Sequence, residues 1–517
     1  MIIGAGPNGL VAANVLADAG WRVLVLEAAD QPGGAVRSAE SVAPGFVSDL
    51  FSSFYPLAAA SPALLDLDLE RHGLRWRHAP SVLAHVFPDG RHVRLSRDLE
   101  TTARSVATFA PADADAWRAE FAYWQRVRDD VLDALLRPFP PVRAGARLAS
   151  ELPRLARMLL LPARVYGEER FAGDGARVLF AGNALHTDLG PDSAAGAAFG
   201  WLLTMLGQEV GFPVPEGGAG RLTDALVRRL TSLGGRVDCG RPVTSVLVAG
   251  GQALGVRDAA GVVVRARRAV LADVPAPVLY RRLVGEEHLP ARLVADLANF
   301  HWDDATVKVD WALSAPIPWQ AEEVRGAGTV HLGADVDGMA GFATDLACGR
   351  LPRDPFLLLG QMTTTDPTRS PAGTEAVWAY THVPRGQQWS PARLRRRAER
   401  VERVIEDQAP GFRDRITGRV ISGPADLEAR NPSLVDGAIN AGTSALHQQL
   451  VFRPVPGLGR ADTPVDRLFL AGASAHPGGG VHGAAGANAA RAALARNGFL
   501  GAGYGTMIRT AHRLLYR

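Results

Sequence analysis

The first thirty residues constrain the fold of this chain more than any other stretch. They contain a short apolar strand at Met1 to Ile3, a glycine-rich turn and a second apolar strand at residues 23–26. Three glycines in a GxGxxG spacing, a helix, and an acid about 20 residues further on form the dinucleotide-binding fingerprint. The glycines allow a tight turn, close approach of the backbone to a pyrophosphate, and packing of the helix on the strand. The predicted contacts are Gly4, Gly6, Pro7, Asn8, Gly9 and, for the ribose hydroxyls, Glu27.

A second glycine turn, Gln31 to Arg37, follows directly and indicates which dinucleotide to expect. With its paired glycines and an arginine close behind, this stretch resembles the flavin-binding superfamily of glutathione reductase-like folds. The resemblance implies that the cofactor is FAD and that Gly33, Gly34 and Arg37 take part in binding it. No second strand-framed fingerprint follows, so the sequence predicts no separate NAD(P)H domain.

Composition limits the classes of function. The 517 residues suffice for two or three cores, and a net charge of +3 gives no indication of nucleic-acid binding. Cys239 and Cys348 are far apart and fit a reducing compartment without a disulfide framework. No signal peptide precedes the first strand, and no apolar run reaches the ~18 residues of a membrane span. We therefore expect a cytoplasmic protein, and we leave open whether its native start lies upstream of Met1.

A basic and leucine-rich segment, Leu132 to Val165, stands out within residues 98–211, which otherwise have an ordinary helical pattern. Prolines interrupt the segment, so it cannot form one long helix. Such a pattern suits contact with an anionic membrane surface or a cover over a lipophilic site, and it equally suits an ordinary helical pair on a core. We predict that the segment borders the substrate entrance, and we leave peripheral membrane contact open.

Two later glycine motifs make the resemblance more specific. Pro215 to Leu222 forms a PxGGxGxL turn ahead of a helix, and His476 to Gly480 has the sequence HPGGG. Together they resemble the phytoene desaturase and carotenoid isomerase family, above all its bacterial phytoene dehydrogenase-like branch of FAD-dependent oxidoreductases. In this superfamily the strand that begins near Val243 contacts the adenine through its backbone, so the resemblance adds Val243 to the predicted FAD contacts.

The last motif runs from a buried strand at Arg467 through a glycine-rich loop into a helix of small residues at Ala484. The N-terminus of that helix would face the pyrimidine end of the flavin and stabilise negative charge there. Many related flavoproteins carry an aspartate after the glycine of this strand, where this chain has Ala473. The predicted flavin contacts are Gly472, Gly479, Gly480 and Val481, and His476 and His482 are candidate catalytic residues, with backbone-bonded loop histidines as the alternative.

Lys308, the only lysine of the chain, lies in a stretch of alternating polar and apolar residues. The alternation predicts a strand with Thr306, Lys308 and Asp310 on one face. In the amine oxidase relatives, a lysine in a similar apolar-Lys-apolar strand holds a water at flavin N5. A compact ammonium at that place would stabilise negative charge that develops on reduction, so Lys308 is our third candidate catalytic residue. The alternative is a lysine that faces solvent.

These motifs together predict an α/β fold, with a glutathione reductase-like FAD-binding Rossmann domain interleaved with a mixed-sheet plus helical substrate domain. We expect the FAD-binding domain in residues 1–75, 213–285 and 455–500, the substrate domain in 76–212 and 286–454, and a C-terminal tail in 501–517. Candidates for the substrate wall are His331, Trp378, Tyr380 and His382, although lone strand histidines are more often structural.

The resemblance implies an FAD-dependent desaturase or dehydrogenase that transfers hydride from a C–H bond of a largely apolar substrate to flavin N5. A flavin amine oxidase and a carotenoid isomerase-like enzyme without net redox change are alternatives, as is a lipid or prenyl escort protein of the same fold. The aromatic pair of amine oxidases is absent around His476 to Gly483, and the flavin motifs that escort proteins have lost are intact here. No metal site is predicted. The substrate, the electron acceptor (oxygen or a quinone) and the oligomeric state are left open.

Overall fold

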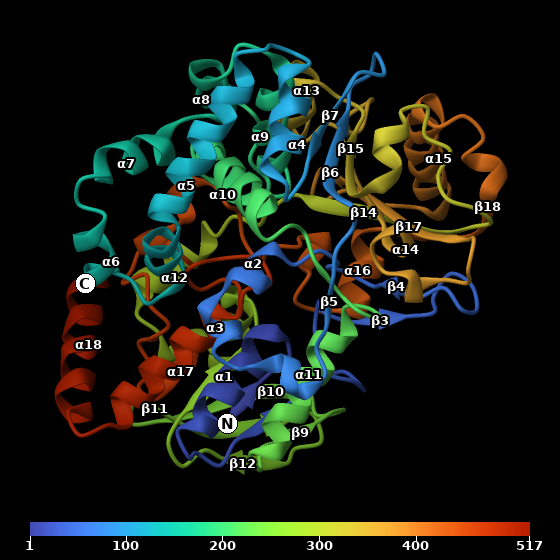
Figure 1. Cartoon of the computed structure of the whole chain (residues 1–517). Helices are drawn as coiled ribbons and strands as arrows, with labels where there is room; N and C mark the ends of the chain where they lie inside the picture. The colour runs from blue at the N-terminus through green and yellow to red at the C-terminus, as the bar shows by residue number, and fades with distance from the viewer.

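The computed structural model describes residues 1–517 and has two main sheets, each covered by helices (Figure 1). A parallel sheet lies near the N-terminus, at the bottom of the view, and a larger mixed sheet lies at the upper right. Helices from residues 99 to 209 make up the upper left part of the molecule, next to the C-terminal helix. None of the helices combines the length and the apolar character needed to cross a bilayer.

The parallel sheet has five strands in the order β19-β13-β1-β2-β9. They are β1 (Ile2–Ile3), β2 (Leu24–Leu26), β9 (Arg236–Asp238), β13 (Val270–Ala272) and β19 (Leu468–Leu470). Helices α1 (Pro7–Asp18), α11 (Gly220–Ser232) and α17 (Ala484–Asn497) share one apolar core with this sheet. A small antiparallel sheet of β10 (Val243–Ala249), β11 (Gln252–Asp258) and β12 (Val263–Arg265) lies beside it. Because β1 is central, the glycine turn after it lies at the middle of the carboxyl edge, where α/β sheets bind their ligands.

The mixed sheet has seven strands in the order β18-β14-β17-β16-β15-β6-β7, and only the β15–β6 pair is parallel. They are β6 (Ser81–Val86), β7 (His92–Leu95), β14 (Ala305–Leu313), β15 (Ala327–Leu332), β16 (Leu357–Gln361), β17 (Glu375–Val383) and β18 (Ile416–Ser422). One face is apolar, and residues such as Val309 and Leu359 pack against Val401 of α15 (Pro391–Gln408). The opposite face of β14 carries Thr306 and Lys308, so the predicted alternation is confirmed.

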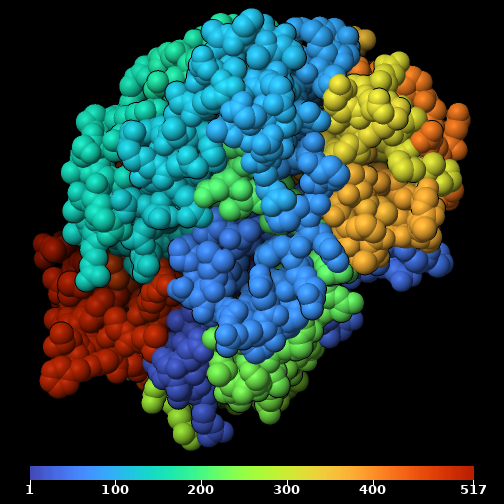
Figure 2. Space-filling view, in the orientation of Figure 1, coloured from blue at the N-terminus to red at the C-terminus, as the bar shows by residue number.

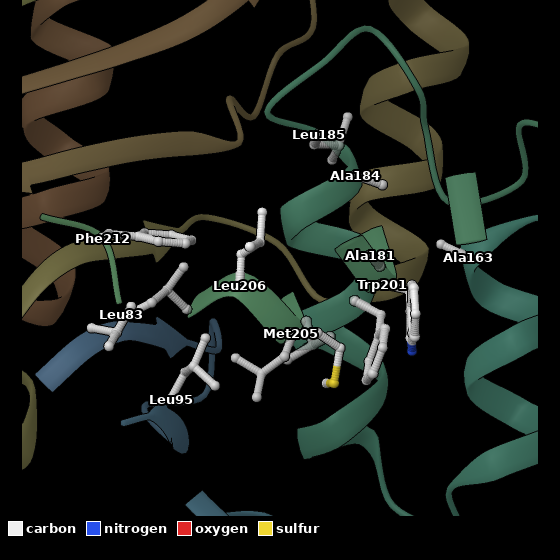
Figure 3. Close-up of a cluster of buried hydrophobic side chains, with 14 of the residues drawn as sticks. Leu83, Leu95, Ala163, Ala181, Ala184, Leu185, Trp201, Met205, Leu206 and Phe212 are labelled. Atoms are coloured by element: carbon white, nitrogen blue, oxygen red, sulfur yellow. The ribbon is translucent and has the colours of Figure 1, made fainter. Parts of the chain in front are cut away.

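The helical part follows β7 without interruption by a strand. Its helices are α4 (Leu99–Ala107), α5 (Asp113–Leu136), α6 (Val142–Arg147), α7 (Leu152–Leu160), α8 (Ala163–Arg170), α9 (Asp174–Ala184) and α10 (Gly196–Glu209). Prolines separate α5 from α6 and occupy the first turn of α7, which confirms that Leu132 to Val165 is not one helix. Helix α10 packs on α9 and on the mixed sheet, where Trp201, Met205 and Leu206 share a buried core with Leu83 and Leu95 (Figure 3).

The remaining strands and α-helices lie between these parts or at the end of the chain. They are β3 (Ser38–Ala39), β4 (Ser48–Asp49), α2 (Pro56–Ala60), α3 (Pro62–Leu65), β5 (Trp76–Arg77), β8 (Val214–Pro215), α12 (Ala291–Ala298), α13 (Val336–Ala347), α14 (Met362–Thr365), α16 (Pro424–Arg430) and α18 (Gly501–Leu515).

The predicted α/β class is confirmed, since the chain passes back and forth between a parallel and a mixed sheet. The residue boundaries of the two domains stay a proposal, and the expected tail at 501–517 is largely helix α18.

Candidate active site

A large cavity, with a volume of about 810 Å³, extends from the parallel sheet to the mixed sheet. Glycine turns line one end, among them Gly4, Gly6 and Gly34. At the other end the lining consists of side chains from β14, β15, β17, α9 and α10. One ligand in the first half and a second ligand in the other half would therefore meet inside the molecule.

The first glycine turn leaves its backbone accessible from the cavity. Gly6 is the N-cap of α1, and a Cβ at Gly6 would lie 2.6 Å from Oδ2 of Asp273, so no other residue fits without a shift. A Cβ at Gly34 would lie 3.0 Å from Cα of Gly6, so the two glycine turns lie in contact. Oδ1 of Asn8 is buried and has no partner in the protein. Free amides at a helix N-terminus, with no side chain over them, fit the pyrophosphate of FAD.

Some of the other predicted nucleotide contacts line the cavity, and others lie behind its wall. Pro7, Asn8, Glu27 and Val243 line the cavity, whereas Gly9, Gly33 and Arg37 do not. Oε2 of Glu27 accepts a 2.6 Å hydrogen bond from the Ala5 amide, which fixes the carboxylate at the end of β2. The Arg37 guanidinium donates to the carbonyls of Gly34 and Arg430. Arg37 therefore supports the second glycine turn from behind.

Asp273 is a cavity residue that the sequence analysis did not find. It follows β13 directly, and its Oδ2 accepts a 2.8 Å hydrogen bond from the Gly9 amide in the first turn of α1. Burial, with a smaller contribution from the nearby charge of Glu27, raises the pKa of Asp273 to about 7, and the hydrogen bond from the Gly9 amide opposes the shift. The signal was available, because β13 reads as an apolar strand and a carboxylate directly after a parallel strand lies at the ligand-binding edge.

The C-terminal loop supplies the middle of the cavity. Gly479, Gly480, Val481 and His482 line it, while Gly472 packs against Val274 behind it. Nδ1 of His482 accepts a 3.0 Å hydrogen bond from the Ala484 amide at the start of α17. Burial lowers the pKa of His482 to about 4, so the ring is neutral at neutral pH.

His476 has a different environment from His482. It does not line the cavity and its ring lies edge-on to Phe139, with centroids 6.0 Å apart. Burial lowers its pKa to about 4 as well. His476 is therefore a buried neutral ring behind the loop, and its Nε2 has no hydrogen-bond partner in the protein.

Arg453 is a fully buried cation that holds two loops together, and no motif indicated it. Its guanidinium donates to the carbonyl oxygens of Thr443 at 2.9 Å, Ala473 at 2.9 Å and Asn440 at 3.3 Å. Burial lowers the pKa of Arg453 to about 10, and the charge of Asp303 opposes the shift. The loop that follows β19 and the loop at residues 440–443 therefore share one anchor.

Lys308 is buried, with 4% of its surface exposed, and lines the cavity. Its Nζ donates to the Asp49 carbonyl oxygen at 2.9 Å and forms an ion pair with Asp310 two residues along β14. The Asp49 carboxylate in turn lies 2.6 Å from the guanidinium of Arg369, and both side chains are fully buried. The alternative that Lys308 faces solvent is therefore wrong, because the polar face of β14 is turned toward the cavity.

The four candidates for the substrate wall behave differently. Trp378 and Tyr380 line the cavity with stacked rings, 5.9 Å between centroids. His331 and His382 are buried behind the wall. Nε2 of His331 lies 2.8 Å from Nε2 of His186, a cavity residue that the sequence analysis missed. No group of three or more His, Cys, Asp or Glu side chains is arranged to hold a metal ion.

Comparison with known proteins gives a consistent result over nearly the whole chain. The family described as "Flavin containing amine oxidoreductase" matches residues 8–494. The "Pyridine nucleotide-disulfide oxidoreductase domain-containing protein 2" of Rattus norvegicus is 29% identical over 541 residues, which cover 95% of this chain and 92% of that protein. The phytoene desaturase (neurosporene-forming) of Cereibacter sphaeroides is 26% identical over 527 residues, with 96% and 94% covered. The crystal structure of an oxidoreductase from Methanosarcina mazei shares the fold, with a TM-score of 0.63, 18% identity, and 95% and 99% covered.

Proposed function

We propose that this chain, which belongs to the flavin-containing amine oxidoreductase family, oxidises a largely apolar substrate by removal of a hydride from a C–H bond. It is an FAD-dependent oxidoreductase of the desaturase or dehydrogenase type. The observation that carries the proposal is the continuous cavity, which joins a backbone-lined end suited to FAD with an end that has an apolar wall on α10 and aromatic side chains on β17. When bound, FAD supplies the hydride acceptor.

Within this proposal the chain contributes binding, orientation and electrostatics. Gly4, Gly6 and Gly34 give the pyrophosphate access to backbone amides, and Glu27 binds the ribose. His482 keeps a proton on Nε2, because its Nδ1 accepts from the Ala484 amide. Phe199, Leu202 and Leu203 of α10 exclude water from the reacting end.

We propose that the Lys308 ammonium stabilises negative charge that develops at the reacting end of the cavity. Its burial, its position on the cavity wall and its fixed contact with Asp49 support this role. The ion pair with Asp310 holds the ammonium in place on the cavity wall. His482, in the glycine-rich loop after β19, remains a further candidate catalytic residue, whereas His476 packs behind that loop and does not line the cavity.

Anaerobic reduction of the bound flavin tests the proposal. A panel of lipophilic substrates should include at least one that bleaches the flavin absorption band when oxygen is excluded. Release of peroxide with amines but not with apolar substrates would instead support the amine oxidase alternative. A colourless protein that binds lipids would support the escort alternative.

We propose further that the segment Leu132 to Val165 borders the substrate entrance and contacts a membrane surface mainly through apolar side chains. Leu135 and Leu136 line the cavity, and Leu160 in α7 is 64% exposed. Figure 2 shows this segment beside α18, and Arg460 donates both to the Phe139 carbonyl oxygen and to the Tyr504 hydroxyl of α18. Exposed apolar side chains of α18, namely Met507, Leu514 and Leu515, extend the surface.

Most arginines of this segment are neutralised by carboxylates, which weakens the electrostatic argument for membrane contact. Arg147 is paired with Asp130 and Asp133, and Arg157 is paired with Glu169. Co-sedimentation with neutral phosphatidylcholine vesicles tests the apolar contact. Leu160→Glu should reduce the bound fraction, whereas Leu65→Glu, at another exposed leucine, should not. Equal binding of both variants would refute membrane contact by this segment.

A further inference from the structure

The substrate half of the cavity has two chemically different walls. The wall formed by α10 is apolar and consists of Phe199, Leu202 and Leu203. The wall formed by the mixed sheet is polar, because the cavity face of β14, β15 and β17 carries hydroxyl and ammonium groups. Its lining residues include Thr306, Lys308, Thr329 and Tyr380. A substrate made only of hydrocarbon would match the first wall and leave the unpaired hydroxyls of Thr306 and Thr329 on the second wall without hydrogen bonds.

Two buried polar atoms of the cavity wall, one on α9 and one on β15, have no hydrogen-bond partner in the protein. They are the Thr329 hydroxyl and Oδ1 of Asn183, and each side chain is 1% exposed. The Asn183 amide nitrogen donates at 2.9 Å to the Leu179 carbonyl oxygen and to the Thr204 hydroxyl, which fixes the direction of Oδ1. A buried polar group without a partner costs about 1–3 kcal/mol, so such atoms on a cavity wall indicate a ligand that satisfies them.

His186 joins these atoms from the end of α9. Its Nε2 lies 2.8 Å from Nε2 of His331, and His331 follows Thr329 by two residues on the same face of β15. Burial lowers the pKa of His186 to about 3, with a smaller contribution from His382, so the ring is neutral. Lys308 lies three strands away in the sheet, about 14 Å, and its charge is balanced by Asp310. The contact between α9 and β15 therefore offers hydrogen bonds without net charge.

We infer that Thr329, Asn183 and His186 form a subsite for a neutral oxygen function, so that the substrate is an apolar molecule with a hydroxyl or carbonyl group. The inference rests on the proposed function for the identity of the substrate cavity. The hydroxyl and the imidazole can donate, and the Asn183 oxygen can accept. An ammonium or a carboxylate would lose its hydration without gaining a counter-charge. Because the subsite lies far from Lys308, it positions the chain of the substrate and leaves the oxygen function unreacted.

Calorimetric titration of the FAD-loaded protein tests this subsite without any redox reaction. The probes are 1-decanol, decane delivered in cyclodextrin, decanoate and decylammonium. We expect 1-decanol to bind most tightly. Thr329→Val, which removes only the hydroxyl, should weaken 1-decanol binding by about three- to tenfold and leave decane binding unchanged. Thr381→Val is the matched control, since Thr381 is a fully buried threonine of β17 that does not line the cavity.

Three results would overturn the inference. The first is equal affinity of the unmodified protein for decane and 1-decanol. The second is tighter binding of decanoate or decylammonium than of 1-decanol. The third is a Thr329→Val variant that prefers 1-decanol over decane as strongly as the unmodified protein does. His186→Phe supplies the same comparison if Thr329→Val does not fold. Failure of the proposed function would be seen separately, as flavin that no lipophilic substrate bleaches.

Discussion

The two ends of the cavity differ in the groups that form their contacts. At the nucleotide end the contacts come from backbone exposed by glycines, and the key side chains, Glu27 and Asp273, are held by backbone amides. At the substrate end the contacts come from side chains whose positions depend on buried ion pairs and on packing of α9 and α10 against a sheet. At the nucleotide end a larger side chain would clash, whereas at the substrate end removal of one ion-pair or hydrogen-bond partner leaves the other buried and unpaired. Substitutions should therefore act by steric overlap at the nucleotide end and by loss of a partner at the substrate end.

Removal of the Lys308 charge should have the largest effect. Lys308→Met leaves the buried Asp310 carboxylate without its cation, and loss of one partner of a buried pair costs about 3–5 kcal/mol of unfolding free energy. Chemical denaturation measures this loss. The double variant Lys308→Met/Asp310→Asn should regain much of the stability, because neither charge remains.

Turnover separates the structural role of Lys308 from its proposed electrostatic role. Both the single and the double variant should bind FAD and reduce it slowly in stopped-flow experiments with a substrate. A double variant with normal stability and normal rates would limit Lys308 to a structural role.

A side chain at Gly6 should have the next largest effect, at the opposite end. Gly6→Val places atoms against Asp273 and on the path of the pyrophosphate, and overpacking of this kind costs about 3 kcal/mol, or roughly 100-fold in FAD affinity. We expect a colourless purified protein, as measured by its visible spectrum. Gly341→Ala is the control, because a Cβ there meets nothing within 4 Å. If Gly6→Val is yellow at full occupancy, the assignment of this turn to the pyrophosphate is wrong.

The smallest of the three effects concerns pH and Asp273. Its pKa is raised by burial to about 7, so the folded protein without FAD keeps a proton between about pH 4 and 7 that the unfolded chain has lost. The Asp273 contribution to stability is therefore full at low pH and is lost as the pH rises through 7. Asp273→Asn should lack this dependence, so wild type should lose on the order of 2 kcal/mol relative to the variant between pH 4.5 and 8. Parallel denaturation curves at both pH values would contradict the protonated state.

The glycine turns and the acid at the nucleotide end could be identified from the sequence, because their arrangement depends on residues close together along the chain. Gly4, Gly6 and Glu27 are read from a spacing along one βαβ unit, and the α/β class follows from it. The alternation of polar and apolar residues in β14 was equally local, yet it could not show whether the polar face meets water or the cavity. That depends on α15, which lies about ninety residues further along the chain and covers the apolar face, so that the polar face is turned to the cavity.

Apart from the candidates Trp378 and Tyr380, which line the cavity, the substrate end could not be predicted, because its groups meet only in the folded molecule. His186 and His331 lie on α9 and β15, and neither stands in a motif. Arg453 contacts carbonyl oxygens, which carry no sequence signal at all. At the nucleotide end, Asp273 could have been found from the sequence, since its place after a parallel strand was visible and only its contact with Gly9 needed the structure.

The order of strands in the parallel sheet has a consequence for the synthesis of this protein. Strand β1 is made first, but β19 is added to the same sheet only after nearly the whole chain, and α17 then packs against α1. At about 5–20 residues per second, the ribosome needs roughly half a minute or more to make the intervening chain. During that time the apolar surface of α1 lacks its final partner. The nascent chain is therefore expected to depend on chaperones until the last strand emerges.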